Sequence, residues 1–153
     1  MTSMSSRLVK VGIVGAAIAV SLGYALPDAG ASGEPLKEWA ASVQATDNAF
    51  RSSYTSLQAA LKAGDIAKAR SSYEKMSTLA VNFSTDAGAV WANTSLYNAV
   101  VNFGYDMNQW AWAGYIAVGG GAGTMATYDA AQSRFATAMG VFTKALNKVD
   151  ASI

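Results

Sequence analysis

The chain has 153 residues, enough for one domain with a buried core, and a formal net charge of only +1 at pH 7. It contains neither cysteine nor histidine. This composition excludes disulfides, zinc sites of ordinary composition, histidine-ligated haem and nucleophiles activated by histidine. We expect neither a metal ion nor a cofactor.

The charges are balanced once the first 31 residues are set aside. Residues 32–153 hold nine basic and nine acidic side chains. A protein that binds nucleic acid needs a surplus of basic residues to displace counterions from the phosphates. We therefore expect no DNA or RNA partner.

Residues 1–31 have the layout of a signal peptide or signal anchor. A polar, basic segment precedes an apolar run over residues 11–26, and the small residues Ala29-Gly30-Ala31 follow. The run has 16 residues, fewer than the ~20 of a comfortable membrane span, which favours cleavage before Ser32. If the leader is retained, residues 11–26 are a membrane tether and the basic residues keep the N-terminus in the cytoplasm. In both cases we expect an extracytoplasmic protein, secreted, periplasmic or in the cell envelope.

Two amphipathic helices are predicted after a linker over residues 32–35. The first begins at Leu36 and ends near Gly64, and Asp65 is placed to cap the second. In both helices apolar residues recur mainly at spacings of three and four, so that they share one face. They are Leu36, Trp39, Val43, Phe50, Tyr54, Leu57 and Leu61 in the first helix, and Ile66, Ala69, Tyr73, Met76, Ala80 and Phe83 in the second.

Two further helices follow. Asp86 and Gly88 separate the second helix from a third near residues 89–118, and the glycine-rich run 119–123 precedes the fourth. The fold class predicted for residues 36–153 is all-α, an antiparallel up-down four-helix bundle behind an N-terminal hydrophobic helix. The apolar line of the fourth helix is Met125, Tyr128, Ala131, Phe135, Met139, Phe142, Leu146 and Val149.

The third helix is unusual because Asp106 is its only charged residue. A bundle helix needs an apolar arc of only about 100°. The apolar arc here is wider, which indicates either a partner that covers it or a central position among three neighbouring helices. Its polar residues form one narrow stripe made of Ser95, Asn98, Asn102, Asp106 and Gln109.

Four hydrophobic residues near the end of the third helix form a predicted aromatic tip. Trp110 and Trp112 are about 200° apart on a helix, so both cannot point into the same core. Together with Tyr115 and Ile116 they either anchor a protein interface or close the end of the bundle.

Asp106 is the remaining candidate for chemistry. A carboxylate among aromatic residues has a raised pKa and can act as an acid or base. Glycosidase chemistry needs a second carboxylate, and this helix has none. A structural role, hydrogen-bonded to Tyr, Asn or an arginine such as Arg51 or Arg134, is the more common case.

The sequence therefore predicts a non-enzymatic, extracytoplasmic protein that binds another protein or a second copy of itself. The candidate interaction residues are Trp110, Trp112, Tyr115, Ile116 and Asp106. The alternative is a carrier whose cavity for a small apolar or aromatic ligand is lined by aromatics and by Met76, Met107 and Met139. A membrane-tethered exclusion or immunity factor is also compatible with the sequence.

Overall fold

The computed structural model describes residues 34–90 and 93–151, and the predicted leader lies outside them. The described chain is helical, without strands, which confirms the all-α prediction. Its elements are α2 (Glu34–Ala63), α3 (Ile66–Asp86), the short 3-10 helix η1 (Ala87–Val90), α4 (Thr94–Val118) and α5 (Thr124–Ala151).

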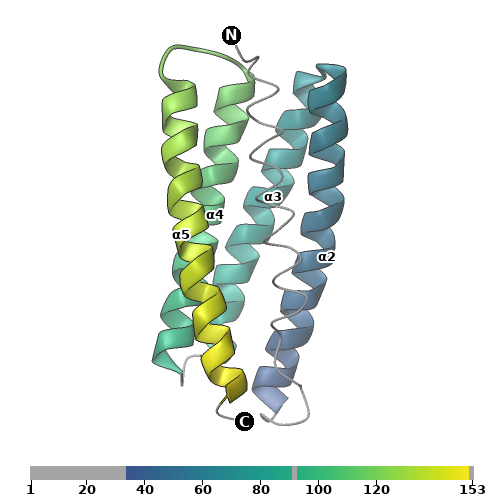
Figure 1. Ribbon diagram of the computed structural model, residues 1–153. Helices are drawn as coiled ribbons and strands as arrows, with labels where there is room; N and C mark the ends of the chain where they lie inside the picture. The colour runs from purple at the N-terminus through teal and green to yellow at the C-terminus, as the bar shows by residue number, and fades with distance from the viewer. Residues whose placement is uncertain (1–33, 91–92, 152–153) are drawn as a thin grey trace.

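The four long helices run alternately up and down, each beside the next in the chain (Figure 1). The α2–α3 and α4–α5 turns lie at one end, here called the distal end, and η1 and the last turn of α5 lie at the other. Among the described residues, the backbones of α2 and α3, of α3 and α4, and of α4 and α5 approach each other closely, and those of α2 and α5 do not. The first and last helix are therefore farther apart there than consecutive helices.

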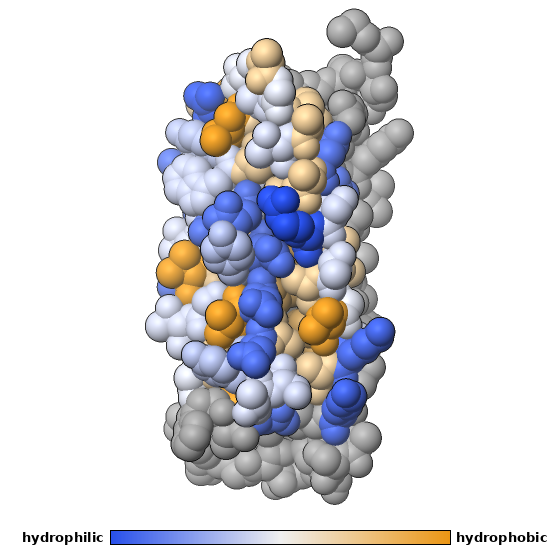
Figure 2. Space-filling view, turned by 90° about the vertical axis from the view of Figure 1, so that its left-hand side faces the viewer, coloured by the Kyte–Doolittle hydropathy of each residue, from blue (hydrophilic) through white to orange (hydrophobic). Residues whose placement is uncertain are grey.

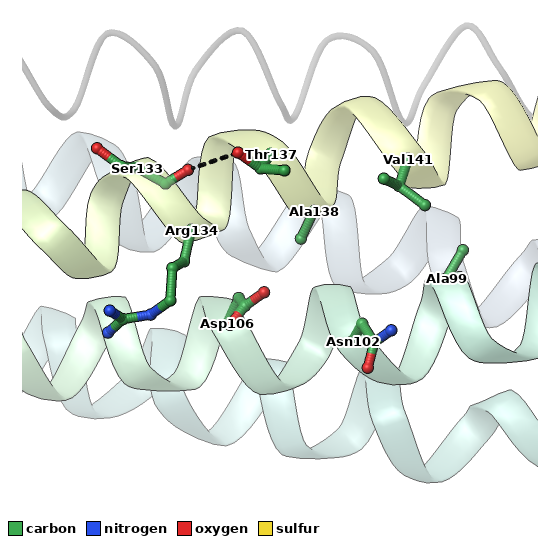
Figure 3. A pocket seen from close by; sticks show the side chains of 8 residues that line it. All are labelled: Ala99, Asn102, Asp106, Ser133, Arg134, Thr137, Ala138 and Val141. Carbon is green, nitrogen blue, oxygen red and sulfur yellow. Dashed lines mark hydrogen bonds between the residues drawn. The ribbon is translucent and has the colours of Figure 1, made fainter.

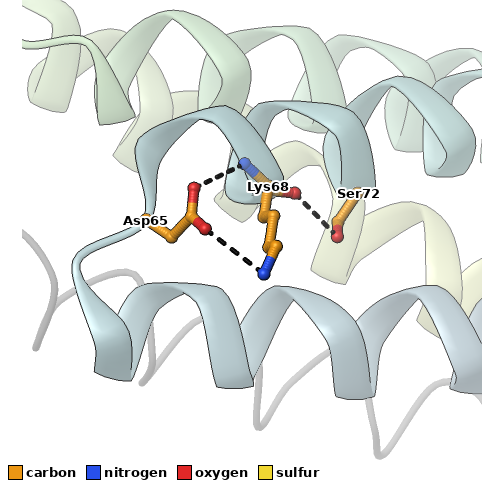
Figure 4. Close-up of polar contacts among 3 residues, drawn as sticks. All are labelled: Asp65, Lys68 and Ser72. Carbon is orange, nitrogen blue, oxygen red and sulfur yellow. Dashed lines mark hydrogen bonds and ion pairs between the residues drawn. The ribbon is translucent and has the colours of Figure 1, made fainter.

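The α2–α3 turn forms as the sequence predicts. Gly64 adopts a positive φ of 69°, which glycine reaches without steric cost, and ends α2. The Asp65 carboxylate then accepts a hydrogen bond of 3.0 Å from the backbone N–H of Lys68 and caps α3 (Figure 4). The Lys68 ammonium lies 3.6 Å from the same carboxylate, and the Ser72 hydroxyl donates to the Lys68 carbonyl at 3.1 Å. The turn is thus fixed by local contacts.

Two helix boundaries differ from the predicted ones. Helix α2 begins at Glu34, two residues early, which places Pro35 in the first turn where its missing N–H costs nothing. Helix α4 begins at Thr94 rather than near residue 89, because Asn93 caps it by accepting a 3.0 Å hydrogen bond from the Leu96 N–H. The preceding residues 87–90 form η1 instead.

Trp110 of α4 lies at the centre of the core and is only 1% exposed. Its ring centroid lies 5.6 Å from that of Tyr73 and 5.3 Å from that of Phe135. The rings of Phe50 and Tyr128 both lie 6.4 Å away. One side chain therefore joins residues of α2, α3 and α5, and burial of each such ring stabilises the fold by roughly 1.5–3 kcal/mol.

Two glycines let α3 and α4 approach closely. A Cβ at Gly114 would lie 2.3 Å from Cε1 of Tyr73, and one at Gly104 would lie 2.9 Å from the backbone oxygen of Ala80. Neither distance is compatible with a real side chain. The close approach of α3 explains why α4 has glycine at these two positions, although glycine weakens the interior of a helix.

The buried hydroxyls of Tyr73 and Tyr128 hydrogen-bond to each other at 3.2 Å. Burial raises the pKa of both phenols above the ordinary value of 10.0. The folded state therefore favours the protonated phenols over the phenolates. Their contribution to the free energy of unfolding is complete below pH 10 and is lost as the pH rises above 10.

We expect the free energy of unfolding to fall steeply above pH 10, by up to about 1.4 kcal/mol per pH unit for each tyrosine. The double variant Tyr73→Phe/Tyr128→Phe removes both ends of the hydrogen bond and should give a shallower slope. Unfolding monitored by circular dichroism from pH 8 to 12 measures both slopes. Equal slopes would show that these phenols do not control alkaline unfolding.

Candidate interaction surface

Helix α4 presents two different faces. Its inner face follows the core through Leu96, Val100, Phe103, Met107 and Trp110, all buried. Its outer face carries a line of residues at alternating spacings of three and four, the pattern of a helix that packs against another helix. We call this line the α4 seam: Asn98, Val101, Tyr105, Asn108, Trp112 and Tyr115.

The seam is accessible and uncharged. Tyr105 is 62% exposed and Trp112 is 44% exposed, and Ile116 beside the seam is 54% exposed. Asn98 is exposed, and the other three seam residues are half-buried. The cores of protein interfaces are poor in charged residues and rich in Trp and Tyr, and the seam has this composition.

The distal end of the seam is held in place by a neighbouring helix. The Trp112 and Tyr115 rings meet edge to face, 5.3 Å apart at 64°. Arg70 of α3 places its guanidinium 5.0 Å from the Tyr115 ring centroid, and its Nε donates to the Tyr115 carbonyl at 3.4 Å. The distal end of the seam is therefore held by contacts with α3.

The middle of the seam is also anchored to α3. The Ser77 hydroxyl donates to the side-chain oxygen of Asn108. This bond fixes the orientation of the Asn108 amide at the edge of the helix. Sequence reasoning missed both Ser77 and Arg70 because neither belongs to the helix whose surface they support.

The four residues of the predicted aromatic tip separate into two groups. Trp112, Tyr115 and Ile116 reach the surface together, as the aromatic tip requires. Trp110 does not, because its ring fills the centre of the core. We therefore remove Trp110 from the candidate surface. Tyr105, which belongs to the seam, was not among the predicted residues, although its spacing of seven from Trp112 could have indicated it.

Asp106 lies on the side of α4 that faces α5. It lines a groove of about 390 Å³ with Arg134 and six neutral residues, and it is the only carboxylate among them (Figure 3). Partial burial raises the pKa of the Asp106 carboxyl, and the positive charge of Arg134 opposes this shift. In Figure 3 the Arg134 side chain reaches from α5 towards α4, with its guanidinium turned away from the carboxylate.

The hydroxyl groups of this groove serve their own helix. Ser133 donates to the carbonyl of Asp129 at 3.2 Å, and Thr137 donates to the carbonyl of Ser133 at 3.0 Å. Neither hydroxyl is paired with a general base in these bonds. The lining residues of this groove therefore offer one carboxylate, one guanidinium, and two hydroxyls that are bonded within α5.

The most hydrophobic described residues of the α4–α5 side lie apart from one another. Figure 2 shows them as separate spots, with hydrophilic residues crossing the middle of the view. The candidate surface is therefore a narrow seam along one helix rather than a broad hydrophobic face.

The residues proposed for a ligand cavity are core residues. Met76 and Met107 are buried in the hydrophobic core, and Met139 packs against it. None of the three lines the groove at Asp106 or the second groove between α2 and α3, which includes Ser42 and Asp86.

The chain matches no protein family, no curated protein and no solved structure. None of the helices in the described ranges combines the length with the hydrophobicity that crossing a bilayer demands.

Proposed function

We propose that this chain is a non-enzymatic, exported or membrane-tethered helical protein that binds another protein or a second copy of itself. The binding surface is the α4 seam, with Ile116 beside its distal end.

The observation that supports this proposal is the uncharged seam on α4, in which Tyr105 and Trp112 are exposed. Elsewhere on the described surface the helices carry exposed charges, for example Lys68 and Glu74 on α3 and Arg134 on α5. A helix that only faces water gains solubility from such charges. Their absence from the seam, where Tyr105 and Trp112 are exposed instead, favours a surface that is covered by a protein.

Export is supported by the sequence alone. Residues 1–31 combine a basic start, an apolar run and a small-residue cleavage pattern. The membrane tether through residues 11–26 lies outside the described residues. A reporter enzyme fused to the C-terminus should be active outside the cytoplasm, and activity only inside the cell would contradict this part of the proposal.

Truncation of the seam should weaken assembly without unfolding the chain. We expect Trp112→Ala and Tyr115→Ala each to reduce the assembled fraction at least about tenfold, because aromatic anchors dominate binding energy in interfaces. Native mass spectrometry of the purified full chain measures the assembled fraction, and circular dichroism measures helicity.

A matched control is Val141→Ala, which truncates a residue of α5 that is 52% exposed and lies outside the seam. This variant should assemble like the original protein. If both seam variants also assemble normally, or if the original chain is found only as a monomer without any bound protein, the proposal is wrong.

A further inference from the structure

We infer that the α4 seam pairs with the seam of a second copy in an antiparallel helix–helix contact about a twofold axis. This inference rests on the proposed function, because it names the partner of the same surface. The partner is therefore an uncharged helical seam with aromatic and amide side chains.

The seam residues are complementary to themselves in the antiparallel direction. Asn98 would face Tyr115 of the second copy, Val101 would face Trp112, and Tyr105 would face Asn108. All three pairs share one midpoint, between residues 106 and 107, which is close to the centre of α4 (Thr94–Val118). The two helices would therefore overlap over their full length.

The chemistry of each pair also fits. Val101 against Trp112 is an apolar contact. Tyr105 against Asn108 brings a phenol to an amide whose oxygen already accepts from Ser77, so that the amide nitrogen can donate to the phenol. Each contact occurs twice because the interface is symmetric.

Charge explains why a second copy is favoured over an unrelated protein. A twofold axis brings residues near it close to their own copies, so a charge there meets a like charge. The seam has no charge, and Asp106, the single charged residue of α4, lies on the α5 side and lines the groove there. An uncharged stripe is suited to pairing with itself.

Charge also selects the antiparallel direction. Arg70 lies against Tyr115 at the distal end of the seam. Parallel pairing would place the two Arg70 side chains at the same end, where they repel. Antiparallel pairing places them at opposite ends, about 25 Å apart along the axis for a rise of 1.5 Å per residue. A contact through one helix is small for a specific interface, so we expect a reversible dimer.

The absence of cysteine from the chain makes a direct test possible, because one introduced cysteine is the only thiol. In the antiparallel dimer two Tyr105→Cys thiols lie about 4.5 Å apart along the axis, and two Asn98→Cys thiols lie about 25 Å apart. Tyr105→Cys should therefore form a covalent dimer with a short bis-maleimide, and Asn98→Cys should not. A mixture of Asn98→Cys with Tyr115→Cys should form a covalent heterodimer.

Two measurements complete the test. Val141→Cys on α5 is the exposed control and should remain monomeric after cross-linking. Sedimentation equilibrium should show a dimer whose dissociation constant rises at least about tenfold in Trp112→Ala. Equal cross-linking at positions 98 and 105 would indicate a parallel dimer and overturn the inference.

The failure of this inference is distinguishable from the failure of the proposed function. A chain that stays monomeric alone, but loses a complex with a different protein in Trp112→Ala, overturns the homodimer and retains the seam as a binding surface. A dimer that is unchanged by Trp112→Ala and by Tyr105→Ala overturns both.

Discussion

Gly114→Ala should lower the free energy of unfolding by about 1–3 kcal/mol, although alanine is by itself about 1 kcal/mol better than glycine in a helix. The added Cβ would lie 2.3 Å and 2.4 Å from Cε1 and Cζ of Tyr73. That ring is buried and its hydroxyl is held by Tyr128, so it has little room to move. The clash must separate α3 from α4.

Gly140→Ala is the matched control for this prediction. It introduces the same group into α5, where a Cβ meets nothing within 4 Å apart from the adjacent backbone of its own helix. We expect it to stabilise the fold by about 0.5–1 kcal/mol. Denaturant unfolding of the two variants, monitored by circular dichroism, compares them directly. If Gly114→Ala is as stable as Gly140→Ala, the close contact between α3 and α4 is not real.

Trp110→Ala should cost about 3–5 kcal/mol, the largest effect of any single truncation that we predict. The substitution removes the ring that joins Phe50, Tyr73 and Phe135, and it leaves a cavity at the centre of the core. Domains of this size are stable by only 5–15 kcal/mol in general, so the variant can unfold. Trp110→Phe keeps an aromatic ring and should remain folded with a smaller loss.

Trp112→Ala makes the same chemical change two residues further along the chain. Because Trp112 is exposed, we expect a loss below about 1 kcal/mol. Thermal and denaturant unfolding of the two variants tests whether the tryptophans differ in this way. Equal losses would contradict the assignment of Trp110 to the core and of Trp112 to the surface, and with it the seam.

Local signals in the sequence were sufficient for most of the helix boundaries. Gly64 and Asp65 each act through their own backbone or their nearest neighbours, so the end of α2 and the start of α3 were predictable. The start of α4 was not predicted, because the apolar residues 89–92 resemble the beginning of a buried helix and outweigh the capping signal of Asn93.

The candidate site was predictable only in part. Periodicity showed that one of Trp110 and Trp112 must leave the core. Composition showed that the third helix has a single charged residue. It did not show which tryptophan turns inward, nor that Arg70 lies on Tyr115. These facts depend on the rotation of α4 against α3, which is set by close packing at Gly104 and Gly114.

The amino-acid sequence by itself determined that the chain is helical, where most helices end, and that its third helix has a single charged residue, because these properties follow from residues within a few positions of one another. The tertiary structure alone decided which face of α4 is buried, which aromatic residues reach the surface, and that the backbones of α2 and α5 do not approach each other closely in the described part of the chain. The physical reason is that a helix fixes the angle between its own side chains, whereas its orientation towards its neighbours is chosen by how side chains from distant parts of the chain fit together.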